Sequence, residues 1–320
     1  FWIGTLTAGS HTIKGRFAVI SSGTATISNR ILLIYVLNGD AFLYLDSSTT
    51  STTSSTSLVD DPAASFTFTP SGTCKALILY NAANSGASES AGGKIAAIRV
   101  GSTDYSQAEK SPFSNDYPDS VFTLWAMQLS ASSTTVKGRF ASSSGTISIH
   151  RRQLGVLMFA DGTLLDTVSS DTQVSTTSSA LQDDPQATIS RTTSDTRELL
   201  VVAMGTKRSG TSSSATGECY GIKVNANDRA NSRGSGVSDA SANSAGIAYA
   251  ENLASGSQTI KGRFSNNQGT DTAKIDSRRI VALWLSAGGG GPSTLLTFNS
   301  KYIVTSTTAA TTTSSSLVDD

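Results

Sequence analysis

The tetrapeptide Lys-Gly-Arg-Phe occurs three times in this chain of 320 residues, at a spacing of 123 and then 124 residues. A second motif, Leu-x-Asp-Asp, also recurs and keeps nearly the same period. Two motifs that return in unchanged order indicate tandem copies of one domain, and a unit of this length can bury its own core. The copies are Lys14–Phe17, Lys137–Phe140 and Lys261–Phe264 for the first motif, and Leu58–Asp61, Leu181–Asp184 and Leu317–Asp320 for the second.

The segments around these motifs have the pattern of short strands, because apolar and polar residues alternate between turns rich in glycine and serine. No stretch has a sustained helical period. We therefore predict an all-β fold of tandem antiparallel β-sandwich, jelly-roll-like domains of about 123 residues. Gly15 shares a strand face with Phe17, and we expect this glycine to make room for Trp2, whose counterparts are Trp125 and Tyr249.

The domain boundaries follow from the phase of the motifs and from a glycine run before Pro292, which has the composition of a linker. Neither end of the chain contains a whole repeat. We expect these ends to be completed by adjacent copies of the protein or by continuation of the same polypeptide, because an open sheet edge invites another strand. The predicted units are 1–40 (the closing half of a sandwich), 41–160 and 161–287 (complete sandwiches), 288–292 (linker) and 293–320 (the opening part of a further sandwich).

The strand at 31–37 is apolar throughout, so we expect both of its faces to be covered. Alignment of the copies separates these faces. One face stays aliphatic and is the predicted sandwich core: Leu32, Ile34 and Val36, then Leu154, Val156 and Met158, then Val281, Leu283 and Leu285. The other face changes in size between copies, as expected for contact with a neighbouring domain or subunit. This predicted assembly face consists of Leu33, Tyr35, Leu37, Leu157, Phe159 and Trp284.

Each Lys-Gly-Arg-Phe copy places two cations on one strand face, which could hold an acidic ligand such as a glycan. The alternative, which is commoner, is a solvated face whose cations pair with carboxylates across the strands. The residues concerned are Lys14, Arg16, Lys137, Arg139, Lys261 and Arg263.

Carboxylates in the second motif are weak candidates for calcium ligands, namely Asp60, Asp61, Asp183 and Asp184. Adjacent side chains on a strand point to opposite faces, so they cannot chelate as a pair without a turn. No metal site is therefore predicted.

The remaining chemistry of the chain is sparse. His11 and His150 have no recurring nucleophile or metal-spaced partner, so we predict no catalytic residues, no cofactor and no enzyme activity. Cys74 and Cys219 fall at non-equivalent positions of different repeats, which indicates lone buried thiols rather than a disulfide framework.

Charge is sparse and balanced, with 24 basic and 24 acidic residues, so nothing indicates binding to nucleic acid. No apolar run is long enough to span a bilayer. Serine and threonine are abundant, and lysine is scarce. Such a hydroxyl-rich surface favours a secreted or virion-exposed protein.

Two stretches carry a family resemblance. One reads Leu-Thr-Ala-Gly-Ser-His-Thr-Ile-Lys and then Ser-Gly-Thr-Ala-Thr-Ile before an apolar strand, and the other reads Ser-Leu-Val-Asp-Asp-Pro and then Phe-Thr-Phe-Thr-Pro. They resemble the closing and opening strands of TNF/C1q-like jelly-roll repeats, which occur in phage virion proteins and in large microbial surface or filament proteins. The resemblance covers essentially the whole chain. It implies a sandwich that assembles, often as a trimer, although the tandem arrangement departs from that pattern.

These observations predict a structural role, as a repeat segment of an extracellular filament, fibre or virion appendage that is built by domain packing and strand completion. Its partners would be other copies of itself or the continuation of the same chain. The alternative is an adhesin, a receptor- or glycan-binding module whose loops 101–120 and 225–245 contact a cell surface. Large apolar contacts between copies would favour the first hypothesis, and an aromatic-lined pocket the second.

Overall fold

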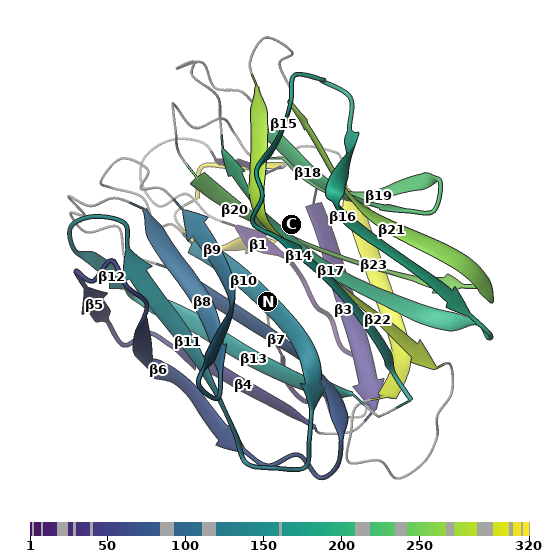
Figure 1. Cartoon of the computed structure of the whole chain (residues 1–320), viewed down its shortest axis with the longest axis horizontal. Coiled ribbons are helices and arrows are strands. Elements are labelled where there is room, and N and C mark those ends of the chain that lie inside the picture. Colours follow the sequence, from purple (N-terminus) through teal and green to yellow (C-terminus); the bar gives the residue numbers. More distant parts are fainter. Residues whose placement is uncertain are drawn as a thin grey trace.

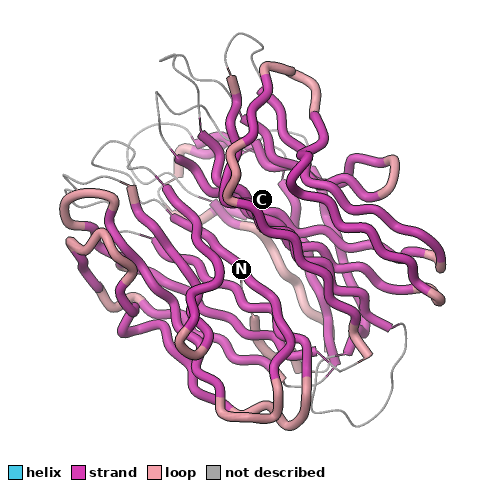
Figure 2. Tube along the Cα trace, viewed as in Figure 1, coloured by secondary structure: helices cyan, strands magenta, loops and turns pink. Residues whose placement is uncertain are grey.

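The structure is a computed structural model, and it contains strands but no helix in the parts of the chain that it describes (Figure 2). This confirms the all-β fold of antiparallel sandwiches. The described residues are 1, 3–7, 9–17, 25–27, 30–38, 41–83, 93–110, 120–159, 162–208, 218–233, 242–266, 272–286, 297–306, 310–314 and 316–319.

The first sandwich consists of two antiparallel sheets (Figure 1). Their strand orders are β10-β7-β13-β4 and β6-β11-β8-β9, and a short pair, β5 with β12, lies beside them. The strands are β4 (Phe42–Ser47), β5 (Ser51–Thr53), β6 (Val59–Phe68), β7 (Cys74–Ala83), β8 (Lys94–Val100), β9 (Thr103–Lys110), β10 (Ser120–Leu129), β11 (Thr134–Ser142), β12 (Ile147–Ile149) and β13 (Arg151–Phe159).

The second sandwich repeats this order as β20-β17-β22-β14 and β16-β21-β18-β19, with β15 paired to β22. Many connections cross from one sheet to the other, as in a jelly roll, whereas the hairpins β8–β9 and β18–β19 stay within one sheet. The domain boundaries themselves stay a prediction. The strands are β14 (Leu164–Ser170), β15 (Val174–Thr176), β16 (Gln182–Thr193), β17 (Arg197–Arg208), β18 (Glu218–Val224), β19 (Asn227–Arg233), β20 (Ala242–Leu253), β21 (Gly256–Asn266) and β22 (Ala273–Ser286).

The two end segments of the chain pair with each other. Each pair has a counterpart in the complete sandwiches, since β1–β25 matches β11–β6, β2–β24 matches β12–β5 and β3–β23 matches β13–β4. The sequence had indicated completion by another copy or by a continuation, and had not foreseen this pairing. The strands are β1 (Arg16–Phe17), β2 (Ala25–Ile27), β3 (Arg30–Asn38), β23 (Thr297–Ser306), β24 (Ala310–Thr312) and β25 (Val318–Asp319).

The glycine of the Lys-Gly-Arg-Phe motif makes room for a tyrosine rather than for a tryptophan. A Cβ on Gly138 would collide with the ring of Tyr80, which is fully buried between the sheets. In the second sandwich, a Cβ on Gly262 would lie 2.9 Å from Cβ of Ala187 and 3.1 Å from the hydroxyl oxygen of Tyr220. The expected partner Trp125 instead stacks on Tyr105. Trp2 lies outside the described residues.

The predicted surface loops are partly strands. Within 101–120, Thr103–Lys110 forms β9, and within 225–245, Asn227–Arg233 forms β19 and Ala242 begins β20. These edge strands are rich in short polar residues, which mimic loop composition because only one side of such a strand meets the core. In β9, for example, Ser106 and Ala108 are buried. The remainder, 111–119 and 234–241, lies outside the described residues.

Candidate functional site

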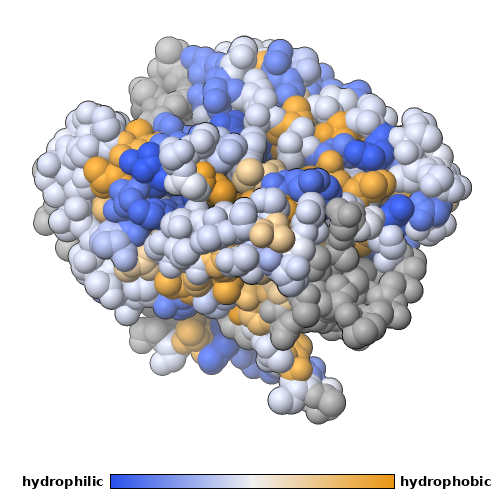
Figure 3. All heavy atoms as spheres, turned by 60° about the horizontal axis from the view of Figure 1, so that its bottom comes forward, coloured by the Kyte–Doolittle hydropathy of each residue, from blue (hydrophilic) through white to orange (hydrophobic). Residues whose placement is uncertain are grey.

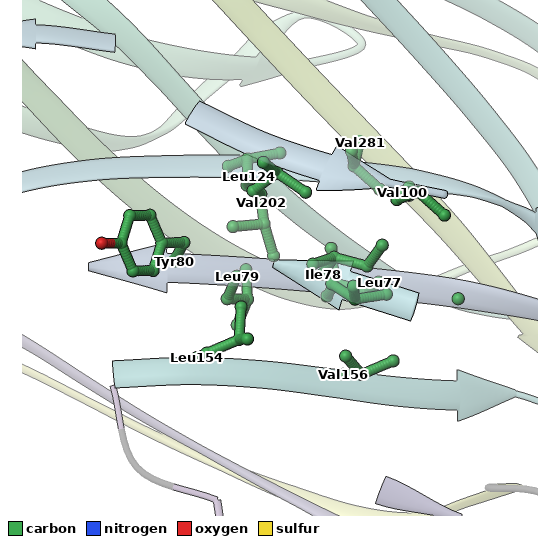
Figure 4. Close-up of a cluster of buried hydrophobic side chains, with 14 of the residues drawn as sticks. Leu77, Ile78, Leu79, Tyr80, Val100, Leu124, Leu154, Val156, Val202 and Val281 are labelled. Atoms are coloured by element: carbon green, nitrogen blue, oxygen red, sulfur yellow. The ribbon is translucent and has the colours of Figure 1, made fainter. Parts of the chain in front are cut away.

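An apolar contact joins the two complete sandwiches. One continuous cluster contains Leu77, Leu79 and Leu124 of the first sandwich together with Val202 and Leu283 of the second. Figure 4 shows side chains from both sandwiches in this cluster. Strands β9 and β10 of the first sandwich pack on β17, β20 and β22 of the second. The outer faces of two sheets therefore meet in a shared apolar core, which is separate from the interior of the second sandwich.

At the rim of this shared core, β20 of the second sandwich closely contacts β10 of the first. A Cβ on Gly246 of β20 would lie 2.7 Å from Cδ1 of Phe122 on β10, so only a residue without a side chain fits there. Next to it, the hydroxyl of Ser244 accepts a hydrogen bond from the backbone N–H of Phe122 at 3.2 Å.

The paired end segments reach the same core. Leu33 of β3 packs against it, and β3 and β23 contact β20 and β22 (Figure 1). At the start of the chain, Phe1 lies edge-on to Tyr44 and to Phe122, with ring centroids 6.1 and 6.3 Å apart. A Cβ on Gly155 would lie 2.6 Å from Cδ1 of Ile3. Sheets from all three parts of the chain thus converge on the shared core.

The residues of the predicted assembly face lie in different places in the structure. Leu33, Leu157 and Phe159 belong to the shared core or pack against it. Trp284 does not, because it is fully buried in the interior of the second sandwich, where its Nε1 donates to Asp166 at 2.8 Å. The side chains of Tyr35 and Leu37 lie outside the described part of the chain.

The error at Trp284 comes from a shift of one residue in β22. The sequence alignment matched Leu154 to Val281, whereas the structure matches Leu154 to Ile280. The register of β22 against β17 is interrupted near Ser277, whose φ of 47° is left-handed. A shift of one residue exchanges the two faces of a strand. In β22, the residues that face the shared core are therefore Val281, Leu283 and Leu285, which the sequence had assigned to the sandwich interior.

Sequence reasoning missed the contributions of β7 and β17 to this core. A usable signal was present, since 199–204 and 77–80 are apolar on both faces, as 31–37 is. The argument that both faces of such a strand are covered applied equally to them.

The predicted charged face is paired with carboxylates across the strands. In the first sandwich, Lys137 Nζ donates to Asp60 at 2.6 Å, and Arg139 Nη1 donates to Asp104 at 2.6 Å. The second sandwich repeats this contact with Lys261 and Asp183 at 2.6 Å, and the end segments repeat it with Lys14 and Asp319 at 2.6 Å. Arg263 also pairs with Asp183, and Arg16 also pairs with Asp319.

These contacts lower the pKa values of the paired aspartates. The hydrogen bond from Lys137 lowers the pKa of Asp60, and the hydrogen bond from Lys261 lowers the pKa of Asp183. The cations of the motif therefore face carboxylates of this chain, which reduces the net positive field available to an acidic ligand.

The second aspartate of each motif points the other way, into the sandwich. Asp61 and Arg152 are fully buried, and Arg152 Nε donates to Asp61 Oδ2 at 2.7 Å. The hydroxyl of Tyr80 donates to the same oxygen at 2.8 Å. Burial, followed by the charge of Asp61, raises the pKa of Tyr80 well above its usual value.

The second sandwich has an equivalent buried pair. Arg278 Nε lies 2.8 Å from Asp184 Oδ2, and the guanidinium also donates to the carbonyls of Ile275 and Thr172, each at 2.6 Å. Burial raises the pKa of Asp184, although the nearby Arg278 acts against that shift.

The calcium candidates are thus engaged by cations on opposite faces of β6 and β16. Among the described residues, no group of three or more histidine, cysteine or acidic side chains lies close enough to hold a metal ion. His11 contacts the carbonyl oxygen of Thr7 at 2.6 Å, and His150 contacts the hydroxyl of Thr50 at 3.1 Å. Cys74 is buried. The side chain of Cys219 is outside the described part of the structure.

Comparison with known proteins gives no family. No family model matches the chain, and no curated protein matches it. The resemblance to TNF/C1q-like repeats therefore stays a prediction.

Solved structures match at the level of general architecture. PNGF-II is 9% identical with a TM-score of 0.36, and the match covers 79% of this chain and 66% of that one. N-glycanase F (PNGase F) is 8% identical with a TM-score of 0.39, over 82% of this chain and 99% of that one. The VP2 subviral particle of infectious bursal disease virus is 9% identical with a TM-score of 0.27, over 93% of this chain and 81% of that one.

These matches correct one expectation. The prediction that the chain is not an enzyme is overturned, because the solved structures that it is similar to include N-glycanase F. At such identities and TM-scores the match assigns no reaction and no catalytic residue to this chain.

Proposed function

We propose that this chain is a structural module of an extracellular or virion-surface assembly, in which β-sandwiches are held in a fixed arrangement by packing their sheets on a shared apolar core. The observation that carries the proposal is that core, where Leu124 of the first sandwich and Val202 and Leu283 of the second are at most 8% exposed. A core of this kind resembles the interior of a domain more than a transient contact, and it holds neighbouring units rigidly.

The hydroxyl-rich composition also supports an exterior structural role. The sequence is rich in hydroxyl side chains, and the lysines Lys137 and Lys261 pair with aspartates of the same chain. The described residues include no helix that could cross a bilayer.

The test is to locate the native protein. Antibodies raised against the chain, used with gold labels in electron microscopy, are expected to mark an ordered filament, fibre or particle surface at regular intervals. The proposal is wrong if the label is confined to dispersed material with no ordered structure and the purified chain stays monodisperse at all concentrations in analytical ultracentrifugation.

A further inference from the structure

In the described part of the chain, large exposed apolar side chains are confined to the two end segments. Among the described residues these are Phe1, Leu6, Ile13 and Leu317, which are 39, 42, 39 and 55% exposed. The two complete sandwiches show none within their described parts. On the face seen in Figure 3, apolar surface forms separate patches among polar residues.

Residues at the same repeat positions are buried in the complete sandwiches. Ile13 precedes the first Lys-Gly-Arg-Phe motif directly, as Val136 and Ile260 precede the other two, and both of these are 0% exposed. Leu6 holds the position of Leu129 and Leu253, which are 4 and 7% exposed. The same sequence position is therefore covered in two copies and uncovered in the third.

The strand pairing shows what covers these positions. In the first sandwich, Val136 pairs with Val100 of β8, and Leu129 pairs with Cys74 of β7. In the second, β18 and β17 take these places. In the described end segments, β3 pairs only with β23 and β1 only with β25. Each of these two sheets thus has an edge where the complete sandwiches carry another strand.

We propose that the edges of β3 and β1 take up a two-strand segment of another polypeptide. Its first strand would be apolar on both faces, as β7 is, and would join β3, while its second strand would resemble β8 and join β1. The inference rests on the proposed function, because this segment would complete the third sandwich of the module. Main-chain hydrogen bonds and burial of the exposed apolar side chains would both favour binding.

A second copy of these 320 residues does not fit as the donor. In each copy, β7 lies between β10 and β13, and β8 lies between β11 and β9. Donation of these strands would open a complete sandwich and expose its core. The described end segments of a second copy hold no spare strand of this kind, since each of their strands is the counterpart of β4, β5, β6, β11, β12 or β13.

The probe is a peptide with the sequence of residues 71–102 of this chain, which contains β7 and β8, fused to an inert soluble carrier. It is added to the full chain, and binding is followed by calorimetry and by hydrogen exchange of the backbone. Residues 12–17 and 30–38 are expected to become protected. A fusion in which Ile78→Asp and Ile98→Asp are combined is the control, because both isoleucines are 0% exposed in the complete sandwich.

Two variants of the chain test the apolar face. Ile13→Asp is expected to weaken binding by about tenfold or more, since it would bury an unpaired carboxylate. Thr12→Asp, on the opposite strand face, is the matched control and is expected to leave binding unchanged. Absence of protection, or equal weakening by both variants, would overturn the inference.

The two proposals can fail separately. If the chain alone dimerises and Ile13→Asp abolishes dimerisation, a second copy covers the face, and the inference is wrong while the structural role stands. If the peptide binds as expected but the native protein belongs to no ordered assembly, the inference stands and the proposed function is wrong.

Discussion

At the scale of single residues, a buried arginine in each complete sandwich determines which face of its strand points into the sandwich. Arg152 and Arg278 each reach a buried aspartate, although they are the second and the first residue of their Arg-Arg pairs. Two charges taken out of water are tolerated only when they are paired and hydrogen-bonded. The requirement to reach the aspartate, rather than the position within the Arg-Arg pair, therefore sets which residues of β13 and β22 point inward.

Replacement of Arg152 should destabilise the protein strongly. Arg152→Met is expected to lower the free energy of unfolding by about 3–5 kcal/mol, because Asp61 would be left buried without its counter-charge. Arg151→Met is the matched control, since its side chain is 67% exposed, and it should change the free energy by less than about 0.5 kcal/mol. Urea denaturation measures both. Adding Asp61→Leu to Arg152→Met should recover much of the loss, and equal effects of the two arginine variants would contradict this account.

At the scale of strands, alternation places adjacent carboxylates in different environments. Asp60 and Asp183 lie on the outer face of their sheets with lysine partners, while Asp61 and Asp184 lie inside. Because lysine lowers the pKa of Asp60 and Asp183, their contribution to stability is present above the usual pKa of 3.8 and is lost as the pH falls through the lowered values. The raised pKa of Asp184 acts in the opposite sense, since protonation of this buried group favours the folded state.

The combined variant Asp60→Asn with Asp183→Asn should flatten the pH dependence of stability at the acid end. Thermal unfolding followed between about pH 5 and pH 2 should show a falling midpoint for the unmodified chain and a smaller fall for the variant. These carboxylates are partly exposed, so the effect should also shrink at high salt. An unchanged slope in the variant would show that other groups cause the acid sensitivity.

The all-β sandwich fold and the pairing of the motif cations with carboxylates across the strands could be predicted from the sequence, but the faces of β22 could not. Alternation and turn residues identify strands locally, and cross-strand charge pairs follow from motifs that recur in the same order. A bulge near Ser277 leaves no clear mark in composition, yet it moves Trp284 from the predicted assembly face to the sandwich interior. Strand β9 was missed for a related reason, since an edge strand with short polar residues has the composition of a loop.

At the scale of the whole molecule, the shared core makes three sets of strands into one unit. Its residues come from β7, β10, β13, β17 and β22, with Leu33 of β3 against them. Such a core has no counterpart in a string of independent domains, where the connections would bend freely. The sequence predicted that both faces of a strand such as 31–37 are covered, but it could not tell which strands would cover it. Packing partners far apart in sequence depend on the whole arrangement.

The contact between Phe122 and Gly246 provides a direct test of this arrangement. Gly246→Ala places a methyl group 2.7 Å from Cδ1 of Phe122, so the ring or the strand must move, and we expect a loss of about 1–3 kcal/mol in the free energy of unfolding. Gly72→Ala is the matched control, because a Cβ there meets nothing within 4 Å. If the two sandwiches pack as described, Phe122→Leu should relieve the clash, and the double variant should be more stable than the sum of the single losses predicts, by about 0.5 kcal/mol or more. Strictly additive losses in this cycle would show that β10 and β20 do not meet in solution, and the shared core would then have to be abandoned.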